Sequence, residues 1–274
     1  MGQYNNNDPF NQYNQYNQYG QQGQPYGMQT GMNNQQFGGQ GYQQAYNQGY
    51  GQPYSAAYTP ADTISSTKYN LIIGACLLYG FIINCIMVST CYDAAASLIM
   101  GSPIVFFILY LAMAIAGGLM VHKSDNPVIS FIGYNLFVLP LGLVLSFVLN
   151  VYVAVGYSDI ITQAFGLTAA ITLIMMAVSS IFPDFFLKLG RTLMITLLIT
   201  IVAEFVMYLM GANLGIIDYV VVLIFCGYIG YDWAKANRVP KTVDNAIDSA
   251  AELYVDMVNL FLRLLRILAR AQSN

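Results

Sequence analysis

Six long apolar stretches follow about residue 65, and they constrain the fold more than any other feature of the chain. They cover residues 69–89, 100–121, 128–151, 160–181, 192–210 and 215–231. A helix that crosses a lipid bilayer needs about 20 mostly apolar residues, so these stretches are suited to span a membrane. Charged residues make up only 8% of the chain, against about 25% in soluble domains. We therefore expect an all-α, polytopic membrane protein.

A seventh segment, from about Asn245 to Ala269, is less apolar and amphipathic. Its polar residues recur every three or four positions, which places them on one stripe of a helix. One interpretation is a helix lying in the plane of the membrane interface. The other is an inward-facing helix that completes a bundle of seven transmembrane helices. Carboxylates along half of the stripe favour the second, because a surface helix on anionic lipid should be basic throughout. The stripe comprises Asp248, Glu252, Asp256, Asn259, Arg263, Arg266 and Arg270.

Basic residues fall in alternate connections between the apolar stretches. The connections at 91–99, 152–159 and 211–214 contain no Lys or Arg. By the positive-inside rule, the N-terminus and the basic connections are cytoplasmic. A full crossing by the seventh segment would put its arginines outside, against this rule; the alternative is a re-entrant helix, and we favour the crossing. The cytoplasmic set is Lys68, Lys123, Lys188, Arg191, Lys235, Arg238 and Lys241.

Residues 1–64 have a different composition, rich in Gln, Asn, Tyr and Gly and without Lys or Arg. Such a segment cannot bury enough apolar area to offset the entropy of ordering, so we expect a disordered cytoplasmic tail. It would serve either as a solvated tether or as a weakly self-associating segment. The domain boundary then falls at about residue 64, with the transmembrane domain at 65–274.

No signature of a cofactor or of nucleic-acid binding is present. The four cysteines are scattered, and one His cannot complete a zinc site with them. The net charge of −3 is too small to indicate a nucleic-acid partner. We expect no cofactor, and a lipid bilayer as the main surrounding, most simply a bacterial plasma membrane.

Two motifs resemble a known family. The stretch FCGYIGYDWAK (Phe225–Lys235) precedes LYVDMVNLFLRLLRIL (Leu253–Leu268), and together they resemble the signature of the Bax inhibitor-1 family of transmembrane Bax inhibitor motif proteins. The resemblance implies a seven-helix bundle with the last helix central. It also implies a pH-sensitive cation leak permeable to Ca²⁺, with two aspartates that share a proton. Those positions match Asp232 and Asp256.

The resemblance further implies a basic latch at the cytoplasmic end of the second helix. The bacterial pattern has an arginine there, whereas this chain reads MVHKSDN (Met120–Asn126). His122 or Lys123 must then substitute, and neither has the planar fork of arginine.

Two adjoining carboxylates cannot both ionise cheaply, so one is expected to keep a proton and to bond the other. Loss of that proton would replace the bond with repulsion and could open the bundle. The ionised pair would also form a weak Ca²⁺ site. Glu204, Glu252 and Asn259 are candidates for the ion pathway, and Glu204 could equally be a structural partner of a basic side chain. Asp218 is expected to be exposed near an outer helix end.

Two other functions are open. One bacterial branch of the family modulates a membrane AAA protease, which suggests a non-conducting regulator that binds a membrane protein. Tyr231-Asp232 also resembles the Tyr-Asp of intramembrane aspartyl proteases. Those enzymes carry Gly-x-Gly-Asp at the second site, where this chain has Leu253-Tyr254-Val255-Asp256, so catalysis is the least favoured function and we expect no enzyme.

Overall fold

The computed structural model describes residues 63–211 and 215–273, and all regular structure in these ranges is helical. The predicted tail, residues 1–64, lies almost wholly outside the described residues. Eight helices follow in chain order: α3 (Ser66–Thr90), α4 (Tyr92–Gly101), α5 (Pro103–Lys123), α6 (Pro127–Ala154), α7 (Ser158–Ile181), α8 (Pro183–Leu209), α9 (Gly215–Ala236) and α10 (Val243–Ser273).

Proline and polar caps set several helix starts. Helices α5, α6 and α8 begin with Pro, whose missing N–H costs nothing in a first turn. The Asn126 side chain accepts a hydrogen bond from the Val128 N–H at 2.9 Å and caps α6. Helix α8 therefore begins at Pro183, well before the apolar stretch at 192–210. The expected connection at 91–99 is likewise mostly helix α4.

Six helices are long and apolar enough to cross a membrane: α3, α5, α6, α7, α8 and α9. Their outer surfaces are apolar, since side chains such as Phe107 on α5 and Ile199 on α8 are more than 60% exposed. Such a surface is unsuited to water and suited to lipid. The chain is thus an integral membrane protein by composition and by the apolar surface of its helices.

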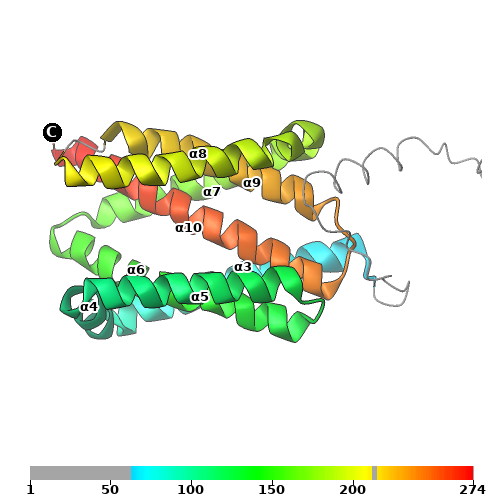
Figure 1. Cartoon of the computed structure of the whole chain (residues 1–274), viewed down its shortest axis with the longest axis horizontal. Coiled ribbons are helices and arrows are strands. Elements are labelled where there is room, and N and C mark those ends of the chain that lie inside the picture. The colour runs from blue at the N-terminus through cyan, green and yellow to red at the C-terminus, as the bar shows by residue number, and fades with distance from the viewer. Residues whose placement is uncertain (1–62, 212–214, 274) are drawn as a thin grey trace, which may run out of the picture. The chain divides into compact units, whose positions relative to one another are not determined.

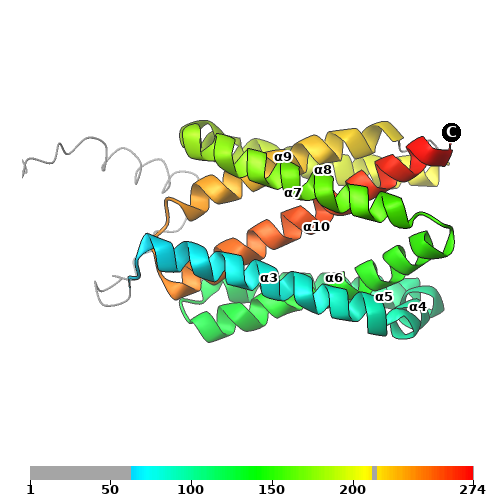
Figure 2. The ribbon, with the colours of Figure 1, turned by 180° about the vertical axis from the view of Figure 1, so that it is seen from behind.

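Helix α10 is not among the six, but it lies inside the bundle. It packs against α3, α5, α6, α7 and α9. Figures 1 and 2 both show it running between a group formed by α3–α6 and a group formed by α7–α9. Every residue from Asp244 to Arg270 is at least partly buried. A helix floating in the interface plane is therefore excluded, because its polar face would be open to water.

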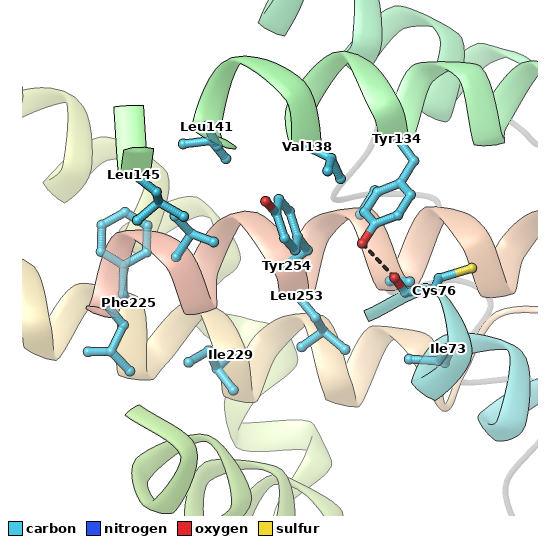
Figure 3. Close-up of a cluster of buried hydrophobic side chains, with 14 of the residues drawn as sticks. Ile73, Cys76, Tyr134, Val138, Leu141, Leu145, Phe225, Ile229, Leu253 and Tyr254 are labelled. Atoms are coloured by element: carbon cyan, nitrogen blue, oxygen red, sulfur yellow. Dashed lines mark hydrogen bonds between the residues drawn. The ribbon is translucent and has the colours of Figure 1, made fainter. Parts of the chain in front are cut away.

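Large side chains fill the space on both sides of α10. Figure 3 shows Tyr254 of α10 pointing toward Val138 and Leu141 of α6. The fully buried Tyr134 hydroxyl donates to the Cys76 carbonyl of α3 at 2.8 Å. The Asn84 side-chain amide donates to the Tyr254 hydroxyl, so polar bonds also tie α3 to α10.

The basic connections meet at one end of the bundle. The Ile64 N–H, just before α3, donates to the Lys241 carbonyl at 2.7 Å. At the start of α6, Ser130 Oγ donates to Asp244 Oδ1 at 2.8 Å. The predicted grouping of these connections on one side is confirmed, and we call this the basic end. Helix α10 starts there and finishes at the opposite end, beside the first turn of α9.

Candidate functional site

Asp232 and Asp256 come together between the last two helices. Asp232 lies near the end of α9 and Asp256 near the middle of α10. The two helices pack against one another, which brings these residues together. Each residue is only 6% exposed. The two carboxyl groups lie close enough to act on one another, and a hydrogen bond between them would tie α9 to α10. Two carboxyl groups can form such a bond only if one of them holds a proton.

No N–H or hydroxyl of the described residues donates to the buried Oδ2 of Asp256. A buried carboxylate oxygen without a donor is costly. A proton shared between Asp256 and Asp232 would reduce this cost.

An ion pair adjoins the two aspartates. Lys235 Nζ donates to Glu252 Oε1 at 2.6 Å, and both side chains are more than 80% buried. His122 Nδ1 of α5 lies 3.6 Å from the same Glu252 oxygen. Glu252 and Lys235 both act electrostatically on Asp232. The site is thus a cluster of three carboxyl groups and one ammonium, with an imidazole at its rim.

The two candidate latch residues differ in position. His122 reaches Glu252, and its side chain is 54% exposed. Lys123 is exposed at the end of α5, and no ion pair involves it in the described part of the chain. Lys235 was not predicted as a site residue. Its spacing of three from Asp232 on one helix was the available signal, because i and i+3 share a face.

The acidic side of α10 continues toward the basic end. Asp244, Asp248, Glu252 and Asp256 follow at intervals of four, so they share one helix face. Ser130 donates to Asp244, whereas Oδ1 of Asp248 is buried and meets no donor among the described groups. This acidic row leads from the end of the bundle to the aspartate pair.

A second charge cluster lies at the far end of α10. Asp218, in the first turn of α9, is fully buried, so our expectation that it is exposed was wrong. It accepts hydrogen bonds from Arg263 at 2.8 Å, from Arg266 at 3.1 Å and from Arg270. A buried carboxylate needs such partners, and the three arginines supply them.

Two of the predicted pathway residues have structural partners. Glu204 of α8 accepts a bidentate contact from Arg263, with Nη2 3.0 Å from Oε2. Asn259 donates to the Val255 carbonyl of its own helix at 2.8 Å. Within the described residues, no group of three or more His, Cys, Asp or Glu side chains is arranged to hold a metal ion.

Comparisons with known proteins agree with this architecture. Residues 63–274 match the family model described as inhibitor of apoptosis-promoting Bax1. A membrane protein of Vibrio cholerae is 29% identical over 71% of this chain and 88% of its own length. A "BI1-like protein" of Arabidopsis thaliana is 31% identical over 64% of this chain and 69% of its length. The "Modulator of FtsH protease YccA" of Escherichia coli is 28% identical over 71% of this chain and 89% of its own length.

Proposed function

This chain belongs to the Bax inhibitor-1 family, and from that premise we propose that it is a pH-sensitive, Ca²⁺-permeable cation leak gated by Asp232 and Asp256. One observation carries the proposal: two buried carboxyl groups on neighbouring helices lie next to one another, where a hydrogen bond between them would require a proton. A buried ionisable group at membrane depth indicates a functional site by default.

In the proposed bundle, α10 is the seventh membrane-crossing helix. Its 31 residues span about 46 Å at 1.5 Å per residue, more than the roughly 30 Å of a bilayer core. Its charged stripe is tolerated because other helices enclose it. The basic end is cytoplasmic by the positive-inside rule, and the bacterial relatives suit a plasma membrane.

The closed state is the singly protonated state. The shared proton bonds α9 to α10, and loss of that proton leaves two negative charges in contact. Their repulsion favours separation of the helices, which is a two-state element biased by pH. The acidic row from Asp244 to Glu252 offers hard oxygen atoms to cations and protons arriving from the basic end.

The Lys235–Glu252 ion pair substitutes in part for an arginine latch. The ammonium lies one helical turn from Asp232, where it offsets negative charge near the pair. His122 lies beside Glu252, the acidic member of this ion pair. Lys123 takes no part in this arrangement.

Calcium flux into proteoliposomes at several pH values tests the leak. Asn in place of either aspartate removes the charge and can bond the remaining carboxylate without a shared proton. We expect Asp232→Asn and Asp256→Asn to abolish the pH dependence of the flux. Asp159→Asn, a matched change at an exposed site on α7, should leave it intact. If both core variants keep the wild-type pH profile, the gating proposal fails.

The alternative is a non-conducting regulator of another membrane protein. It is favoured by the Escherichia coli relative, which is named a modulator of FtsH protease. A regulator of this kind would conduct no Ca²⁺ when purified. It would change the rate at which a membrane AAA protease, reconstituted beside it, degrades its substrates. No catalytic role is part of either proposal.

A further inference from the structure

Two cations of α8 lie on the side of the helix that faces away from the bundle. Lys188 and Arg191 are both exposed and are spaced so that they share one helix face. The same face continues with Ile195 and Leu198, which are 47% and 57% exposed. Phe186, on the opposite side, is buried against α9. Lys188 and Arg191, which we call the α8 cations, therefore belong to the surface that lipid covers.

The packing of α8 on α9 gives the depth of the α8 cations. Phe186 lies against Gly230 of α9, and Leu193 lies against Gly227. Both cations fall between these two contacts along α8, inside a helix that is apolar enough to span a bilayer. Their backbone is therefore at the depth of residues 227–230 of α9.

A tryptophan of α9 indicates where the membrane interface lies. Trp233 is about one turn nearer the basic end than Gly230, and its indole N–H donates to the Ser180 hydroxyl at 2.9 Å. Tryptophan concentrates at the headgroup level of a bilayer. The α8 cations thus begin below that level, and their long side chains reach it by extending toward the basic end.

The described part of the chain provides no counter-ion for the α8 cations. Asp184 lies one turn before Lys188 on the same face, but it accepts a hydrogen bond from Arg238 at 2.7 Å. None of the ion pairs within residues 63–211 and 215–273 includes Lys188 or Arg191. A charge on a lipid-facing surface is costly, so these two cations require an anion from outside the bundle.

We propose that Lys188 and Arg191 together bind the phosphate of an anionic phospholipid in the leaflet at the basic end. Lipid is the occupant because the cations project from the depth of the acyl chains, which a free anion would have to leave water to reach. Two cations against one phosphate favour an anionic headgroup, since a zwitterionic headgroup brings its own cation. Arg191 supplies a planar fork and Lys188 a point charge. The site involves neither the aspartate pair nor ion conduction.

Native mass spectrometry of the full chain, released from nanodiscs of phosphatidylglycerol and phosphatidylcholine, tests the site. We expect wild type to retain phosphatidylglycerol in preference to phosphatidylcholine. Lys188→Gln and Arg191→Gln should each reduce that preference about fivefold, the factor that corresponds to about 1 kcal/mol per basic residue near an anionic surface. Arg191→Lys keeps the charge and loses the fork, so it should fall between Arg191→Gln and wild type. Because both residues are exposed, these variants should keep the melting temperature of wild type in detergent.

Lys68→Gln is the matched control, since Lys68 is an exposed cation in the first turn of α3 at the same end of the bundle. It should retain phosphatidylglycerol like wild type. Equal loss in the Lys68 and Arg191 variants would mean unspecific charge attraction and would overturn the proposal. So would a thermal stabilisation by inorganic phosphate that matches that of phosphatidylglycerol and disappears in Arg191→Gln, because the ligand would then be a free anion.

Discussion

The Lys235–Glu252 ion pair lies one helical turn from each aspartate and joins the same two helices. Its members are 19% and 16% exposed, so neither charge is well solvated without the other. The aspartates could be predicted from their motifs, but this pair could not. Its formation depends on how α9 and α10 align, and that alignment is set by packing of both helices rather than by either motif.

Glu252→Gln should lower the free energy of unfolding, because it removes the carboxylate that pairs directly with the buried Lys235 ammonium. We expect a loss of about 2 kcal/mol, less than the roughly 3–5 kcal/mol of fully buried pairs. Chemical unfolding in detergent micelles measures it. The double variant Lys235→Met/Glu252→Met should recover most of the loss, since neither charge then remains. A double variant no more stable than the single one would show that the ion pair does not explain the effect.

Helix α10 contributes residues to both charge clusters, and its amphipathic pattern was the most useful sequence signal. The period of three to four residues predicted a single polar stripe, and the enclosing helices confirm that it faces inward. The order of the residues also showed that the stripe has an acidic half and a basic half. It could not reveal that Lys235 and Asp218 of α9 pair with these halves. Hydropathy alone also missed the start of α8, which is polar and begins with Pro183, and most of α4, which is too short to span a membrane.

A full crossing by α10 makes a direct prediction about its end. Asn237, between α9 and α10, and Gln272, in the last turn of α10, are both exposed. In a background with all four native cysteines replaced, Asn237→Cys and Gln272→Cys should react with a membrane-impermeant thiol reagent from opposite sides. Labelling of both from the same side would mean that α10 re-enters and does not cross.

The bundle as a whole joins two layers of helices through one central, polar element. The six apolar spans and the grouping of basic connections were predictable from composition and charge, because lipid imposes both. The enclosure of α10 was predicted through its stripe and through family resemblance. Buried partners such as Asp218 were not, because a carboxylate at a helix end looks exposed until the arginines of another helix are brought to it.

The central claim is that one proton, held between Asp232 and Asp256, keeps α9 and α10 together. Infrared difference spectroscopy of the protonated carboxyl group, recorded in proteoliposomes beside the Ca²⁺ flux, tests it most directly. The band that Asp232→Asn/Asp256→Asn removes should fade in wild type over the same pH interval in which the flux rises. A flux that rises while this band stays constant, or a wild type without such a band, would contradict the claim.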